Sequence, residues 1–217
     1  MSGVLLGGGQ EMNKEAALGR LHWHAMKLFT LVFTLLTLIA CGEKEPATKG
    51  EKLAAAAREQ IGVTTSYDPA YVSLKYPGGD IPKEKGVCTD VVIRALREMG
   101  FDLQKLVHED MKKNFSKYPK RWSLTRPDKN IDHRRVPNLK TFFKRRGISL
   151  KVTKNKDDYL PGDLVTCTVA GKLPHIAIVS DKKEDGVPMI IHNIGRGTQE
   201  EARLFDFPIT GHYRWFK

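Results

Sequence analysis

The side chains best suited to chemistry are one cysteine and two histidines, Cys88, His175 and His192. The spacing of apolar residues after Cys88 predicts a helix that begins at this cysteine. A helix N-terminus carries partial positive charge, which lowers the pKa of a thiol and favours the nucleophilic thiolate. A catalytic cysteine also needs a base and a group that orients the base. Taken alone, Cys88 has a simpler interpretation as a small buried apolar residue, which most free cysteines are.

The two histidines fall in the neighbouring runs 173–181 and 189–195, each of which contains a predicted strand. A turn centred on residues 183–184 would join the strands as a hairpin and would place His175 directly opposite His192. Directly opposed residues share a face of the sheet, with Cβ atoms about 4.5–5.5 Å apart, whereas a slip of one residue separates them. The sequence therefore predicts adjacent imidazoles, with His175 as the base for Cys88 and His192 as the orienting group.

Two other arrangements of these residues remain open at this point. A cysteine and two histidines can bind zinc, but the chain has no CxxC or HxxxH pair to support a metal site. Cys88 can also form a disulfide with Cys167 in an oxidising compartment, and that bond would block catalysis. We expect neither a metal nor a cofactor.

The elements around these residues change in type along the chain. Helices are predicted first and strands second, which is an α+β plan with N-terminal helices packed on a C-terminal antiparallel sheet. The predicted helices span 51–61, 88–99, 103–115 and 137–146, and the predicted strands span 148–153, 163–169, 175–180, 189–194 and 213–216.

The N-terminal region has the features of an export signal. Met26 and Lys27 precede thirteen uncharged residues, 28–40, which are too few for a comfortable transmembrane helix of about 20 residues. The run ends in Leu-Ile-Ala-Cys, which resembles the lipobox of bacterial lipoproteins and predicts lipidation of Cys41. Residues 1–25 lack the usual opening of a signal peptide and indicate a long n-region or a misplaced start codon.

This interpretation gives a signal peptide over 1–41, a polar tether over 42–50 and one folded domain over 51–217. Gly42 follows the lipidated position without an acidic retention signal. We therefore expect a lipid anchor in the cell envelope, in the outer membrane facing the periplasm.

The charge of the chain points to an anionic neighbour. The formal net charge is +11, and because residues 1–40 contribute only +1, residues 41–217 keep +10. Such an excess favours a cell-wall polymer, lipid head groups or nucleic acid, although a solvated basic surface explains it equally well. No nucleic-acid-binding motif is present, and export argues against that partner. Peptidoglycan or another anionic envelope polymer is the expected partner.

Several segments resemble known families. Pro-Gly-Asp-Leu-Val at 161–165, followed by a strand that opens at His175, is similar to the NlpC-type cell-wall peptidases, which are compact papain-like enzymes. Segments 86–91, 131–139 and 191–195 resemble domain-of-unknown-function family 1287, and this resemblance covers nearly all of residues 51–217. It implies a papain-like fold and cleavage of an amide bond in peptidoglycan stem peptides.

In the mechanism that the resemblance implies, Cys88 attacks the carbonyl, His175 transfers the proton and His192 orients His175. NlpC-type enzymes usually have Asp-Cys-Ser-Gly at the nucleophile, whereas this chain has Val-Cys-Thr-Asp at 87–90. The segment 100–136 is also long for that group. Both departures leave the substrate open.

Three further residues are candidates for substrate binding, namely Asp90, Arg134 and Arg135. The arginine pair can hold a carboxylate bidentately. The simpler interpretation is a solvated or salt-bridged loop for the arginines and a carboxylate matched to the helix dipole for Asp90. Two alternatives to a hydrolase also remain, a non-catalytic wall-binding or envelope-assembly lipoprotein on the same fold and an acyltransferase that uses the same cysteine.

Overall fold

The computed structural model describes residues 47–217. The predicted leader, the predicted lipidation at Cys41 and the first part of the predicted tether lie outside the described residues. Within 47–217, no helix combines the length and hydropathy that are needed to cross a bilayer.

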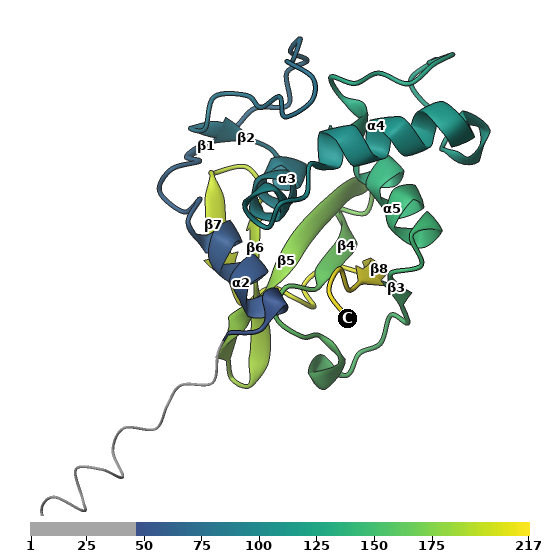
Figure 1. Ribbon diagram of the computed structural model, residues 1–217. Coiled ribbons are helices and arrows are strands. Elements are labelled where there is room, and N and C mark those ends of the chain that lie inside the picture. The colour runs from purple at the N-terminus through teal and green to yellow at the C-terminus, as the bar shows by residue number, and fades with distance from the viewer. Residues whose placement is uncertain (1–46) are drawn as a thin grey trace, which may run out of the picture. The chain divides into compact units, whose positions relative to one another are not determined.

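The described chain has the predicted α+β plan, with helices first and an antiparallel sheet second (Figure 1). The long helices are α2 (Lys49–Arg58), α3 (Cys88–Glu98), α4 (Leu103–Asn114) and α5 (Val136–Arg145). The six-stranded sheet, in the order β3-β8-β4-β5-β6-β7, comprises β3 (Ser149–Leu150), β4 (Leu164–Val169), β5 (Leu173–Glu184), β6 (Val187–Asn193), β7 (Thr198–Glu201) and β8 (Ile209–Tyr213). Two short parallel strands, β1 (Ser66–Tyr67) and β2 (Lys85–Gly86), precede the helix that begins at Cys88.

The hairpin of β5 and β6 differs from the predicted one in its register. The turn lies at Asp185 and Gly186, both of which have positive φ angles of 49° and 74°, and not at residues 183–184. Val179 pairs with Ile190, which is two residues away from the expected Pro188. The direct pairing of His175 with His192 was therefore wrong. Because the shift is even, the two histidines still share a face, as diagonal neighbours.

A bulge in β5 contributes to this register. Between Val179 and Lys183 the strand advances four residues, while β6 advances only two, from Ile190 to Pro188. Extra residues on one strand of an antiparallel pair bend that strand and leave the intervening residues without a partner. The bulged Ser180 is tied down instead by its side chain, whose Oγ donates to Glu200 at 2.5 Å.

Alternating residues of β5 fill two hydrophobic layers. Ile176 and Ile178 face a core with residues of α2, α3 and α5, whereas Ala177 and Val179 pack on the other face with Tyr159. Figure 1 shows α2 and α3 lying in front of the sheet. The helices thus cover one face of β5 and hold the start of α3 beside the start of this strand.

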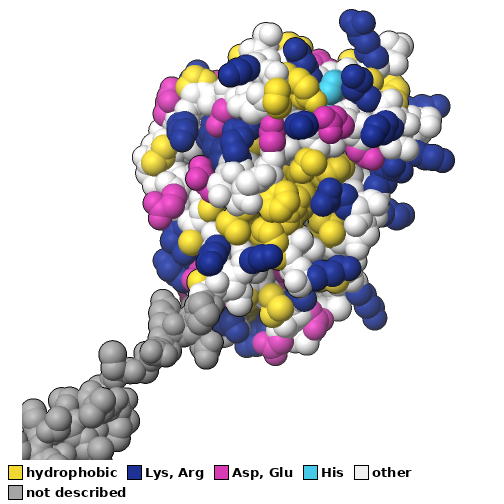
Figure 2. Space-filling model, viewed as in Figure 1, with side chains coloured by type: hydrophobic (Ala, Val, Ile, Leu, Met, Phe, Trp, Pro, Cys, Tyr) yellow, Lys and Arg dark blue, Asp and Glu magenta, His cyan; other side chains and the backbone are white. Residues whose placement is uncertain are grey.

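The surface carries the basic excess. Figure 2 shows Lys and Arg side chains spread over the visible face, around hydrophobic side chains that gather near its centre. An aromatic group of Phe101, Trp215 and Phe216 packs against the core, with Phe101 5.3 Å from Trp215 between ring centroids.

Candidate active site

The first turn of α3 fixes the position of Cys88. Val87 is the N-cap residue, and its backbone N–H donates to Asp90 Oδ2 at 2.7 Å, so the carboxylate satisfies one of the free donors at the helix start. Asn193, at the end of β6, donates from Nδ2 to the carbonyl oxygens of Ser66 and Gly86 at 3.2 and 3.0 Å. These bonds hold the segment before Cys88 against the end of β6.

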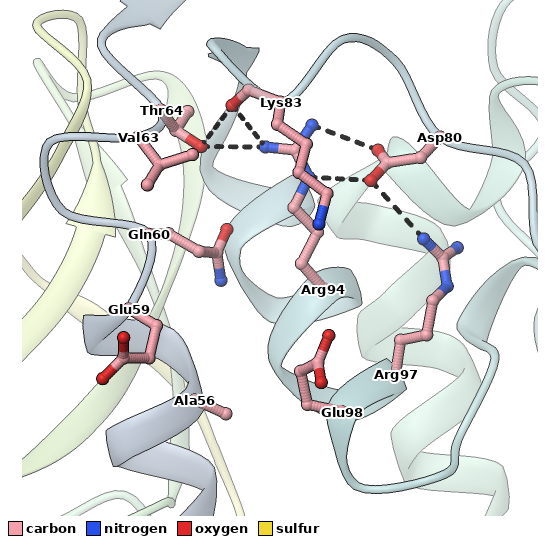
Figure 3. Close-up of a pocket in the computed structure, with 10 residues that line it drawn as sticks. All are labelled: Ala56, Glu59, Gln60, Val63, Thr64, Asp80, Lys83, Arg94, Arg97 and Glu98. Carbon is pink, nitrogen blue, oxygen red and sulfur yellow. Dashed lines mark hydrogen bonds and ion pairs between the residues drawn. The ribbon is translucent and has the colours of Figure 1, made fainter.

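Arg94 ties the loop that leads to Cys88 onto α3 (Figure 3). Its guanidinium pairs with Asp80 at 2.9 Å and donates to Thr64 Oγ1 at 2.9 Å. It also reaches four carbonyl oxygens of the loop, those of Ile81, Pro82, Lys83 and Lys85. A buried guanidinium with this many acceptors is matched in both charge and hydrogen bonding.

The cavity beside Arg94, which Figure 3 draws, has a volume of about 550 Å³ and does not contain Cys88. Three of its charged groups are engaged with one another, since Arg94 and Arg97 both pair with Asp80. Two of the buried atoms in its lining residues, Gln60 Oε1 and Arg97 Nε, have no hydrogen-bond partner within residues 47–217. No cysteine or histidine lines it, and its hydrogen bonds and ion pairs hold the loop before Cys88, which is the role of a structural support.

The thiol of Cys88 is buried, and burial sets its protonation. Only 5% of the residue is exposed, and desolvation raises the pKa of the thiol to about 12. The backbone N–H groups of Ile176 and Thr89 act in the opposite direction because they stabilise the thiolate. The expected lowering of the pKa by the helix start is therefore outweighed by burial, and the resting residue is a neutral thiol.

A chain of hydrogen bonds runs through the two histidines to a carboxylate. His175 Nε2 lies 2.8 Å from His192 Nδ1, and His192 Nε2 lies 2.8 Å from Glu201 Oε2. The other oxygen of Glu201 accepts from Arg196 at 2.6 Å. Ile176, whose N–H faces the Cys88 thiol, directly follows His175. The structure thus brings the start of β5, the end of β6 and the start of α3 together.

This chain determines the tautomers of both rings. Burial lowers the pKa of His175 to about 3 and also lowers the pKa of His192, so both imidazoles are neutral at neutral pH. Burial works against the charge of Glu201, but hydrogen bonds from His192 and Arg196 outweigh it and keep the carboxyl pKa low. The carboxylate can only accept, so His192 carries its proton on Nε2 and accepts at Nδ1. His175 must then donate from Nε2, which leaves the lone pair on its Nδ1 free.

The predicted substrate-binding residues differ in how exposed their charges are. Arg134 is buried and donates to both oxygens of Asp90 at 2.9 Å and to the carbonyl oxygens of Ala70 and Asp68 at 3.0 and 3.1 Å. Both oxygens of Asp90 are thus occupied by the Arg134 guanidinium, which corresponds to the salt-bridged interpretation of this loop. Arg135 is half-buried, and its guanidinium carbon lies 4.0 Å from the centroid of the Trp122 ring.

A second cavity, of about 300 Å³, opens beside Cys88. Besides Cys88 it is lined by Tyr67, Arg121, Trp122 and Arg135. The long segment 100–136 therefore supplies part of the wall next to the thiol. Cys167 pairs in register with His175 on the neighbouring strand, and both it and Cys88 are free cysteines. Within residues 47–217, no three His, Cys, Asp or Glu side chains are placed to hold one metal ion together.

Glu201 and Asn193 are the site residues for which the sequence predicts no role. The strand β7 that carries Glu201 was not predicted, because Thr-Gln-Glu-Glu has no apolar alternation. The only sequence signal for Glu201 is the acidic pair at 200–201. It follows His192 closely enough that a tight turn can place it beside that histidine. Asn193 lies in the segment 191–195, which resembles family 1287, and its residue type alone does not indicate a contact with the loop before Cys88.

The candidate site can be compared with known proteins. The chain is 59% identical over 165 residues to the protein "Uncharacterized protein YijF" from Escherichia coli (strain K12), which covers 76% of this chain and 80% of that protein. Among solved structures, it is similar to NlpC1 from Trichomonas vaginalis, with 14% identity and a TM-score of 0.43 over 81% of this chain and 47% of that one. The family described as "Domain of unknown function (DUF1287)" matches residues 54–215. That match covers most of the sequence, and the chain belongs to this family.

Proposed function

We propose that the chain is a cysteine hydrolase that cleaves amide bonds in the peptide stems of peptidoglycan. The observation that carries the proposal is the hydrogen-bond chain from His175 through His192 to Glu201, which begins beside the buried thiol of Cys88. A neutral imidazole has one donor nitrogen and one acceptor nitrogen. Two histidines in series that end on a carboxylate leave one basic nitrogen free, which is the arrangement that a general base requires.

The reaction begins with a neutral thiol and a neutral imidazole. No hydrogen bond joins Cys88 to the His175 ring within the described residues, so the two groups must approach more closely when substrate binds. His175 Nδ1 takes the thiol proton as Sγ bonds to the carbonyl carbon. The Cys88 backbone N–H, at the start of α3, has no intrahelical acceptor and can stabilise the oxyanion.

Collapse of the tetrahedral intermediate breaks the amide C–N bond, and His175 returns its proton to the leaving amine. Water then attacks the thioester, with His175 as the base, and regenerates the thiol. His192 and Glu201 keep the His175 lone pair available at each step and stabilise the imidazolium that forms transiently. An acyltransferase would follow the same course with an amine or alcohol in place of water.

The test uses the full chain in a nonionic detergent with its thiols reduced, together with purified peptidoglycan and muropeptides. Mass spectrometry reads the products. We expect a new stem-peptide fragment that is lost in Cys88→Ala and retained in Cys167→Ala, the matched variant of the other buried cysteine. If Cys88→Ala still yields the fragment, or if no fragment forms from any substrate, the hydrolase assignment is wrong.

A second candidate function is wall binding without catalysis. The low exposure of Cys88 and its raised thiol pKa are compatible with that alternative. It predicts that the parent and Cys88→Ala proteins sediment equally with purified peptidoglycan and that neither releases a fragment.

The site requires a location where peptidoglycan is present, and we propose a lipid anchor at Cys41 for that purpose. The supporting observation is the sequence alone, in which Leu-Ile-Ala-Cys ends an apolar run. Metabolic labelling with an alkyne fatty acid should mark the parent protein, and Cys41→Ser should remove the label. Fractionation on a density gradient should place the labelled protein with the outer membrane. Label that persists in Cys41→Ser would refute the anchor.

A further inference from the structure

The cavity at Cys88 has a strongly basic wall. Three of its lining residues are arginines, namely Arg121, Arg134 and Arg135, and none is Asp or Glu. The aromatic Trp122 lines the cavity beside them. The charge of Arg134 is matched by Asp90 in a buried pair at 2.9 Å. The other two guanidinium groups are matched less fully, so the cavity next to the nucleophile attracts anions.

Arg121 is the least compensated of these groups. Its side chain is exposed, and it forms no ion pair with any carboxylate within residues 47–217. Arg135 donates only from Nη1, to Asp132 Oδ1 at 3.2 Å, and its Nε and Nη2 have no acceptor among the described residues. A guanidinium offers donors along two edges. Arg135 therefore retains unused donors after its bond to Asp132.

Trp122 holds Arg135 in place. The guanidinium carbon lies 4.0 Å from the ring centroid, a stacking distance that leaves the planar edge of the guanidinium open to a ligand. Trp122 and Ser123 both have positive φ angles, 60° and 52°, which non-glycine residues rarely adopt. Two successive residues in this strained conformation place the indole at the cavity, and such strain is typical of functional sites.

We propose that Arg121 and Arg135, positioned with Trp122, form a subsite for a free carboxylate that the substrate carries near the bond attacked by Cys88. A planar carboxylate fits the edge of a guanidinium in a bidentate geometry. Val136 and Pro137, which also line the cavity, offer apolar contact to the aliphatic part of the same substrate residue. The identification of the bound carboxylate as part of the substrate rests on the proposed function. The binding of a carboxylate at Arg121 and Arg135 does not.

A binding experiment tests the subsite without catalysis. The full chain with Cys88→Ala, in nonionic detergent, is titrated calorimetrically with acetyl-trialanine and separately with its C-terminal amide. We expect the acid to bind about tenfold more tightly than the amide or better, because one charged hydrogen bond is worth at least that ratio. In Arg121→Met and Arg135→Met, the affinity for the acid should fall to that of the amide.

The matched control is Arg126→Met, which removes the same charge from an exposed residue of the same segment outside the cavity lining. It should keep the preference for the acid. Circular dichroism checks that Arg135→Met is folded, and the exposed Arg121 provides a variant with little risk to the fold. The proposal is overturned if acid and amide bind equally, if neither binds at millimolar concentration, or if the preference survives in both variants. Because the Cys88→Ala protein cannot hydrolyse substrate, the calorimetric result does not depend on whether the parent protein releases a stem-peptide fragment.

Discussion

Replacement of Glu201 by Gln tests whether the carboxylate sets the tautomer of His175. Glu201 accepts from His192 through one oxygen and from Arg196 through the other. A glutamine side chain has one oxygen and one NH₂ group, so only one of the two positions now held by carboxylate oxygens can still accept. Because Arg196 can only donate, the amide oxygen will face Arg196 and the NH₂ group will face His192. His192 Nε2 must then accept, and its proton moves to Nδ1.

The change is transmitted to His175. With a proton on His192 Nδ1, His175 Nε2 becomes the acceptor and its own proton moves to Nδ1, the position that must be free to take the thiol proton. The bond from His192 Nε2 to Glu201 spans 2.8 Å and has a charged acceptor. Such bonds contribute about 1.5–3 kcal/mol, so its loss should lower kcat by about 10- to 150-fold.

Two measurements check this reasoning. The rate of stem-peptide release should fall in Glu201→Gln, while long-range ¹⁵N–¹H correlation spectra should show both ring protons exchanged between nitrogens. Glu200→Gln is the matched control, because Glu200 pairs with Arg58, Ser180 and Lys182 and not with a histidine. It should lower the free energy of unfolding and leave the tautomers unchanged. An unchanged ring spectrum in Glu201→Gln would refute the argument, whatever its rate.

Three further predictions follow from burial and charge. Because the thiol pKa is about 12, the rate of Cys88 alkylation by iodoacetamide should rise about tenfold per pH unit between about pH 7 and pH 9. Mass spectrometry of the peptide that contains Cys88 measures this rate. A plateau below pH 8 would contradict the raised pKa. His133 and His175 have folded-state pKa values of about 3 against an ordinary 6.5, so the unfolded chain binds more protons between these limits. Stability should therefore fall as the pH drops from 6.5 towards 3, by about 1.4 kcal/mol per pH unit for each histidine, and a Tm that stays constant across this window would refute the assignment. Arg94→Met removes the guanidinium that bonds the four loop carbonyls and leaves Asp80 with Arg97 alone, at 3.5 Å, so it should lower the free energy of unfolding in urea by about 3 kcal/mol; a loss below about 1 kcal/mol would show that the loop is held by other contacts.

The sequence contained enough to predict the helices and the location of the candidate nucleophile. Apolar residues at helical spacing gave the start of α3 at Cys88, and Gly100 marked its end, where the φ angle is 85°. That the two histidines share a face also followed from strand alternation, since a register shift of two residues changes the partner of a residue and not its face.

The remaining features depend on tertiary contacts that no local pattern contains. The Cys88 thiol pKa is raised by its burial against β5, which outweighs the local effect of the helix start. Glu201 lies on a short polar strand, and its importance appears only when that strand pairs with β6, with His192 opposite Gln199. Arg134 and Arg121 have the same side chain in the same segment, yet one is saturated by Asp90 and the other is exposed, which spacing alone does not distinguish.

The bulge in β5 also separates the site from the tip of its hairpin. The histidines lie on one side of the bulge and the Asp185–Gly186 turn on the other, where Lys183 pairs with Pro188 and Glu184 with Val187. The paired segments before and after the bulge are related by a shift of two residues, so changes of length at the tip need not propagate through the ladder towards His175. The tip is therefore a suitable place to insert a fluorophore, an affinity tag or a crosslinker without disturbing the proton-transfer chain.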